Sequence, residues 1–279
     1  MQNELHNKYN LEKIQFLMNN KSKITEDILQ ELRSYGLAGK QIALDILELK
    51  QYETIQDIHY IEMEKCKNDV IYFKDNYLLI LNKDELQDKM LEGIKIYNKI
   101  HLTSACQSKR TYAACIYALW LFNFYEKKTI GIASYKSTWS KEMISHITNL
   151  HNYIPTWMKI KSRNLKTTMT SEMKSQIVTD LLDGNAFRGR TLDLLIVDCL
   201  EATKAQKFNE FKESVTPKLI FKKAKVIFIG ANPYINVNAD IEINEYTELP
   251  IISERPVLKR TFKQIIKDYI LSLYIKIKG

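Results

Sequence analysis

The sequence predicts an α/β fold, in which a parallel sheet carries helices on its faces and is preceded by a small helical region. Four apolar runs have the length and β-branched content of buried strands: Lys99–Leu102, Thr129–Ala133, Leu192–Val197 and Lys225–Ile229. Helical runs separate most of them, at Tyr112–Tyr125, Lys136–Leu150 and Ala205–Val215. Parallel strands need long crossover connections, which are usually helices, so this alternation indicates a parallel sheet.

One segment gives this fold a candidate binding site. The residues Ser104-Ala-Cys-Gln-Ser-Lys-Arg-Thr111 lie between a strand run and a helical run, the setting of a phosphate-binding P-loop. In such a loop, glycines let backbone N–H groups surround the phosphates, a lysine reaches them and a hydroxyl holds magnesium. Thr111 can supply the hydroxyl, but Arg110 stands at the lysine position and Lys109 at the last glycine position. The sequence therefore predicts a P-loop (ASCE-type) sheet with an altered loop.

Composition limits the classes of function. The 279 residues are 45% hydrophobic, enough for one large α/β domain with a small appendage or for two small domains. The net charge of +8 permits contact with nucleic acid or another acidic surface without requiring it. The four cysteines form no C-x-x-C pair, which speaks against disulfides and a zinc site. We see no signal peptide and no apolar run of membrane-spanning length, and expect no membrane partner.

We expect three parts along the chain. Residues 1–65 read as short amphipathic helices, residues 66–240 as the α/β domain, and residues 241–279 as a basic helical tail. The first part allows two interpretations, a helix-turn-helix that reads DNA or a small helical bundle that packs on protein. Asp45 and Glu48 favour the bundle, because acidic side chains would face DNA phosphates badly.

Several segments resemble, in order and spacing, the N-terminal ATPase domain of phage large terminase subunits, the motors that pump DNA into tailed-phage capsids. The matching segments are Cys66–Tyr77, Leu86–Leu91, Cys106–Thr111, Gly131–Lys136, Phe187–Gly189, Leu194–Asp198 and Ile227–Pro233. No single segment is specific, and their order carries the resemblance.

The resemblance implies a nucleotide site. Gln87 would read the adenine edge through its amide, which offers a donor and an acceptor. Asp198 ends an apolar strand at its carboxyl end, where parallel sheets bind ligands, and would hold Mg²⁺ together with Thr111. The nucleotide-binding residues implied are Gln87, Gln107, Lys109, Arg110 and Thr111. ATP and Mg²⁺ are the implied cofactors, and we expect their binding to be weak.

The departures from the family concern the same site. Cys199 stands where the catalytic glutamate should follow Asp198, and a thiol cannot orient the attacking water as a carboxylate does. Glu201 is the remaining candidate for that role. Gly230-Ala-Asn232 replaces the threonines of the coupling motif. The roughly 45 residues after Ile235 are too few for the family's nuclease domain.

Three hypotheses follow. In the first, the chain is a catalytically degenerate ATPase-fold protein of phage origin, a binding or structural component in DNA packaging or virion assembly. In the second it is an active ATP-hydrolysing packaging subunit, stand-alone or half of a split terminase. In the third it binds double-stranded DNA through the basic tail, Arg255–Lys278, and the N-terminal helices. We expect phage assembly or packaging proteins or a second copy as partners, in the cytoplasm of an infected bacterium or in the virion.

Overall fold

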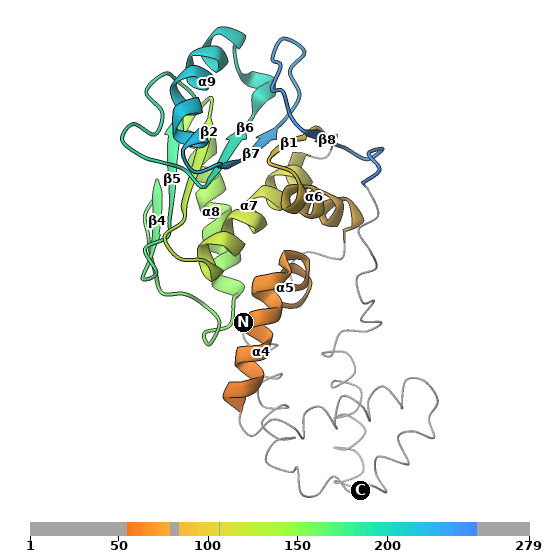
Figure 1. Ribbon diagram of the computed structural model, residues 1–279, viewed down its shortest axis with the longest axis vertical. Coiled ribbons are helices and arrows are strands. Elements are labelled where there is room, and N and C mark those ends of the chain that lie inside the picture. Colours follow the sequence, from red (N-terminus) through yellow and green to blue (C-terminus); the bar gives the residue numbers. More distant parts are fainter. Residues whose placement is uncertain (1–54, 79–83, 106, 250–279) are drawn as a thin grey trace, which may run out of the picture. The chain divides into compact units, whose positions relative to one another are not determined.

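The computed structural model describes residues 55–78, 84–105 and 107–249 (Figure 1). Cys66–Pro250 forms one compact unit. A second unit comprises Met1–Lys65 and Ile251–Gly279, and of it only the helical residues from Ile55 onward are described. The short helices predicted before residue 55, the basic tail from Arg255 and Cys106 lie outside the described residues.

Six α-helices and one short 3₁₀ helix are described. Their bounds are α4 Ile55–Asn68, α5 Val70–Tyr77, α6 Glu85–Ile96, α7 Gln107–Phe124, α8 Ser137–Tyr153, η2 Leu200–Ala202 and α9 Ala205–Ile220. Asp69 and Asp84 begin α5 and α6, because each carboxylate accepts hydrogen bonds from two backbone N–H groups of the following turn. The predicted helical runs correspond to α7, α8 and α9, with their ends shifted by up to five residues. Within the described part, no helix combines the length and the apolar character needed to cross a bilayer.

The strands form one eight-stranded sheet in the order β3-β4-β5-β2-β6-β7-β1-β8. Their bounds are β1 Lys99–Leu102, β2 Thr129–Ser134, β3 Ser162–Asn164, β4 Thr168–Ser171, β5 Gln176–Leu181, β6 Leu194–Asp198, β7 Lys225–Ile229 and β8 Ile241–Ile243. From β5 to β8 every neighbouring pair is parallel, and only β3 and β4 are antiparallel. One strand, β7, separates β1 from β6, which is the order of an ASCE-type P-loop sheet.

The four predicted strands are confirmed as β1, β2, β6 and β7, and the α/β class with them. The other strands were not predicted. Residues Ile241–Ile243, which we assigned to the tail, instead form β8, parallel to β1. A three-residue strand carries too little periodic pattern to be recognised, and this one is held by pairing with β1 and by the buried side chain of Ile243.

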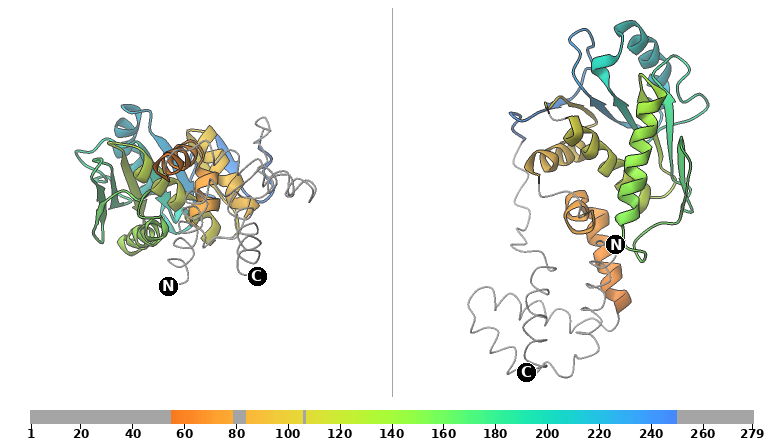
Figure 2. Two further views of the ribbon diagram at one scale, coloured as in Figure 1. Left: turned by 90° about the horizontal axis from the view of Figure 1, so that it is seen from below. Right: turned by 180° about the vertical axis from the view of Figure 1, so that it is seen from behind.

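The alternation of side chains along the strands builds a core on each face of the sheet. In β6, Leu194 and Ile196 belong to the core under α5, α6, α7 and α8, whereas Leu195 and Val197 belong to the core under α9. Figure 2 shows α8 from behind, lying along β2 and β5, which it contacts. The sheet is thus covered on both faces, as an all-parallel sheet requires.

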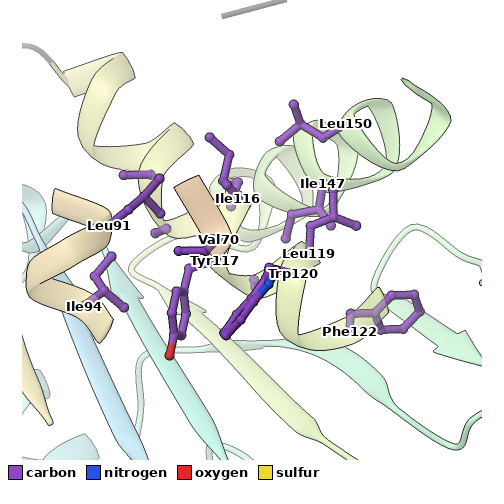
Figure 3. Packing of buried hydrophobic residues seen from close by; sticks show 14 of the residues in the cluster. Val70, Leu91, Ile94, Ile116, Tyr117, Leu119, Trp120, Phe122, Ile147 and Leu150 are labelled. Atoms are coloured by element: carbon purple, nitrogen blue, oxygen red, sulfur yellow. The ribbon is translucent and has the colours of Figure 1, made fainter. Parts of the chain in front are cut away.

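Helix α7 is the centre of the larger core. Twelve of its side chains are buried, and the helix is apolar on nearly all sides. Figure 3 shows its residues Ile116, Leu119 and Trp120 packed near Ile147 of α8, while Leu91 and Ile94 of α6 lie on the other side. A helix held this firmly places its first turn, Gln107–Thr111, at a fixed position beside the end of β1.

Candidate functional site

A cavity of about 550 Å³ lies where β6 ends, between the first turns of α7 and α8. Its apolar and aromatic lining residues are Tyr112, Trp139, Met143, His146 and Ala202. Its polar lining residues are Gln107, Ser108, Thr111, Glu142, Asp198, Cys199 and Glu201. Parallel strands present their carboxyl ends at one edge, and ligands bind there in open α/β sheets. Three carboxylates line this cavity, and no lysine or arginine of the described residues does.

Asp198 is 5% exposed and ends β6 at the cavity wall. Burial raises the pKa of its carboxyl above the ordinary range, while hydrogen bonds from Cys199 oppose that shift. The Cys199 thiol donates to Asp198 Oδ2 at 3.3 Å. Burial and the adjacent Asp198 carboxylate raise the pKa of the Cys199 thiol far above its ordinary value. Cys199 therefore remains a protonated donor at neutral pH and is unsuited to activating water or to acting as a nucleophile.

Lys109 does not line the cavity. Its Nζ lies 2.8 Å from Asp84 Oδ2. Asp84 Oδ1 accepts from the backbone N–H groups of Leu86 and Gln87, so this one carboxylate ties the start of α6 to the start of α7. At the position of the P-loop's last glycine, the chain thus has a lysine held by an internal carboxylate.

Arg110 does not line the cavity either, and its ion-pair partner does. Its side chain is 9% exposed, and Nη2 lies 3.6 Å from Glu201 Oε1. That distance is an ion pair but too long for a hydrogen bond. Within the described part of the chain, Arg110 Nε is buried and has no hydrogen-bond partner. The guanidinium at the P-loop lysine position is therefore paired with a carboxylate and keeps unused donor capacity.

Two residues that follow β7, Gly230 and Asn232, contact Glu201 or the η2 segment that carries it. Gly230 has a φ of 98°, and a Cβ on it would lie 2.8 Å from Glu201 Cδ and 3.2 Å from the Leu200 nitrogen. Asn232 Nδ2 donates to the carbonyl oxygens of Leu200 and Thr203, at 3.0 and 2.9 Å. The two residues at the coupling-motif positions thus fix the short η2 segment that carries Glu201.

A third carboxylate binds the loop backbone. Ala105 N–H donates to Glu245 Oε1 at 2.9 Å, and Thr103 Oγ1 donates to Glu242 Oε1 at 2.6 Å. Both glutamates come from β8 or from the segment that follows it. The backbone at the start of the loop is therefore held by a side chain of the same molecule.

The remaining predicted site residues separate into two groups. Gln107 and Thr111 line the cavity together with Asp198 and Glu201. Gln87 does not line it; its side chain is buried at the start of α6, and its Oε1 has no hydrogen-bond partner among the described residues. The structure brings the two implied Mg²⁺ ligands, Thr111 and Asp198, to one cavity, and leaves Gln87, Lys109 and Arg110 outside its lining.

The side chains present fit a divalent cation better than a triphosphate. Thr111 and Asp198 supply oxygen ligands of the kind Mg²⁺ prefers. Ser134, beside Asp198 in the β2–β6 register, is buried and its hydroxyl has no partner in the described part. A triphosphate would instead meet Glu142, Asp198 and Glu201, with both loop cations already paired. The donor set therefore does not fit a triphosphate in this arrangement.

Some cavity residues had no signal in the sequence. Tyr112, Trp139, Glu142 and His146 belong to no motif of the sequence, yet all four line the cavity. Asp84 is recognisable as a helix cap by pattern, but its pairing with Lys109 joins residues 25 positions apart. Among the described residues, no cluster of three or more histidine, cysteine or acidic side chains has metal-binding geometry. The order of the motifs therefore identified Gln107, Thr111, Asp198 and Glu201, but not the residues that α8 adds to the cavity.

The sheet order and the loop define the described unit as a P-loop-class α/β fold. No family model matches the chain. Among solved structures, it is similar to the large terminase ATPase domain of Thermus phage P74-26, at 15% identity and a TM-score of 0.47, over 59% of this chain and 71% of that one. It is also similar to the HK97 bacteriophage large terminase, at 12% identity and a TM-score of 0.49, over 59% and 37% of the two chains. Likeness this distant assigns no activity or partner.

Proposed function

We propose that this chain is a terminase-like P-loop protein that does not hydrolyse ATP at an enzymatic rate, and that it serves as a binding or structural component in phage DNA packaging or virion assembly. The sheet order and the order of the motifs support the class. One observation carries the loss of activity: the loop's two cations and one of its backbone N–H groups are engaged by carboxylates of the same chain. Lys109 pairs with Asp84, Arg110 with Glu201, and the Ala105 N–H with Glu245.

Weak nucleotide binding is part of this proposal. Thr111 and Asp198 would hold Mg²⁺, which would also offset the negative charge of the cavity. Gln107, which lines the cavity, would supply a polar contact, whereas the buried Gln87 would not reach a ligand there in this arrangement. Cys199 cannot orient a water molecule as a base, and we propose that Glu201 does not replace it, because its carboxylate is committed to Arg110.

ATP turnover by the purified protein tests the proposed function. We expect a rate far below the ~1 s⁻¹ at which ordinary enzymes begin, and no further loss in Asp198→Ala. Cys199→Glu alone should not restore turnover, because Lys109 and Arg110 stay paired. A rate above ~1 s⁻¹ that Asp198→Ala abolishes would establish the second hypothesis, an active packaging ATPase.

The proposed partners are phage assembly or packaging proteins or a second copy of the chain, in the infected cell or the virion. Double-stranded DNA is the alternative that the net charge of +8 favours. Binding to DNA would weaken steeply with salt, because each neutralised phosphate releases counterions. A titration of duplex DNA at several salt concentrations, with and without the residues after 250, distinguishes the two.

A further inference from the structure

We propose that Glu201 is the residue that keeps oxyanions from Arg110, so that the chain's own carboxylate takes the place of a phosphate in this loop. The inference concerns the same site and rests on the proposed function. It makes Glu201 a specificity-determining residue rather than a catalytic base. Three observations on Arg110, Glu201 and Gly230 carry it.

The first observation is the state of Arg110. The side chain is nine-tenths buried, and its nearest charge partner is Glu201, at 3.6 Å. Its Nε lacks a hydrogen-bond partner within the described residues. A buried guanidinium without hydrogen bonds is costly, and carboxylates and phosphates are the groups that satisfy it. Arg110 is therefore competent to bind an oxyanion, and Glu201 already occupies the approach.

The second observation is that Glu201 is open to the cavity. Its side chain is 42% exposed and lines the cavity, whereas Arg110 does not line it. The carboxylate is therefore the group that a ligand in the cavity would meet before Arg110. An ion pair of this kind, half open to solvent and longer than a hydrogen bond, can be displaced by a better ligand.

The third observation is that Gly230, which has no side chain, leaves room for the Glu201 carboxylate. Glu201 lies against Gly230, where any Cβ would collide with it. Asn232 holds the η2 carbonyl groups on the same side, which fixes the segment that carries Glu201. Arg110, Glu201 and Gly230 thus fit one another, although the sequence places them in three separate motifs.

Calorimetric titration with inorganic tripolyphosphate, without divalent cations, tests the proposal. Glu201→Gln removes the competing charge, and we expect about tenfold tighter binding than in the wild-type chain, the value of one charged hydrogen bond. Glu142→Gln is the matched control, since Glu142 lines the same cavity and has no ion pair with Arg110 among the described residues. Its gain should be less than about threefold, a purely electrostatic effect of removing one charge.

The double variant Arg110→Gln/Glu201→Gln should lose the gain. If that variant does not fold, Arg110→Lys/Glu201→Gln replaces it, because lysine keeps the charge but lacks the planar fork; most of the gain should then be lost. Equal gains in the two single glutamine variants, a gain that survives without Arg110, or no gain at all would overturn the proposal. ATP turnover by the wild-type chain would instead refute the proposed function, so the two failures are distinguishable.

Discussion

Cys199 adopts a left-handed backbone, with φ 60° and ψ 47°, directly after Asp198. For a residue with a Cβ this conformation costs roughly 1 kcal/mol or more. Local bonds stabilise it: the Cys199 carbonyl accepts from Ala202 N–H and from Thr203 Oγ1, and its thiol donates to Asp198. Cys199 is thus a structural link between β6 and η2.

Gly230 provides a prediction at the same scale. Gly230→Ala should lower the free energy of unfolding by roughly a few tenths of a kcal/mol more than Gly189→Ala, because the Leu200 backbone cannot move aside as the Glu201 side chain can. Both glycines have a positive φ, 98° and 73°, but only Gly230 has neighbours that a Cβ would strike. Urea denaturation of the two variants measures the difference. Glu201→Ala in the Gly230→Ala background should recover part of the loss; equal costs at the two glycines would contradict the contact.

The buried side chain of His151 should make the stability of the fold depend on pH. It is 2% exposed, neither ring nitrogen has a hydrogen-bond partner among the described residues, and burial, with Lys159 nearby, lowers its pKa from 6.5 to about 4. The unfolded chain therefore binds a proton at a higher pH than the folded chain. Stability from this group is complete above pH 6.5 and is lost as pH falls towards 4, by about 3 kcal/mol at most.

His151→Phe should flatten this part of the pH profile, because phenylalanine fills the same apolar site beside Phe122 without titrating. Unfolding free energies at pH 7, 6, 5 and 4 provide the comparison. If the wild-type chain and the variant lose stability in parallel over this range, His151 is not the cause.

At the scale of elements, α6 and α7 are joined at their first turns by Asp84. Its two carboxylate oxygens make different contacts: Oδ1 caps α6, and Oδ2 forms the ion pair with Lys109. The loop between β1 and α7 is further held by Glu245, beyond β8. Elements that a P-loop would arrange around a phosphate are therefore arranged around carboxylates.

Substitutions at Asp84 separate the contribution of the helix cap to stability from that of the ion pair with Lys109. Asp84→Ala should cost about 1 kcal/mol of stability through the lost cap. Asp84→Asn keeps a capping oxygen and should cost only a few tenths, because the pair with Lys109, whose side chain is 38% exposed, contributes little. Lys109→Ala should resemble Asp84→Asn. A large cost in Asp84→Asn would show that the ion pair, rather than the cap, holds the two helices.

For the whole molecule, local patterns predicted the frame of the fold and left its edges unassigned. The strands β2, β6 and β7 are mostly apolar runs, and α7 is long and strongly apolar, so these elements were readable. The strands β3, β4 and β8 have three or four residues each and depend on their neighbours. Thr111 and Asp198 were predictable from their places after and at the end of a predicted strand, and Glu201 from its distance to Asp198. The pairing of Glu201 with Arg110, and the roles of Asp84 and Glu245, were not predictable, because these contacts depend on the folded sheet.

Across the molecule, the central claim is that both cations of the loop, Lys109 and Arg110, are paired with carboxylates of the same chain without a nucleotide. Calorimetry of ATP binding to the wild-type protein, with and without Mg²⁺, tests it most directly. The account predicts weak binding, with a dissociation constant of roughly 1 mM or higher, about −4 kcal/mol or weaker, and tighter binding with Mg²⁺ than without. A sub-micromolar dissociation constant, or an affinity that Arg110→Ala reduces at least tenfold in the wild-type background, would contradict it.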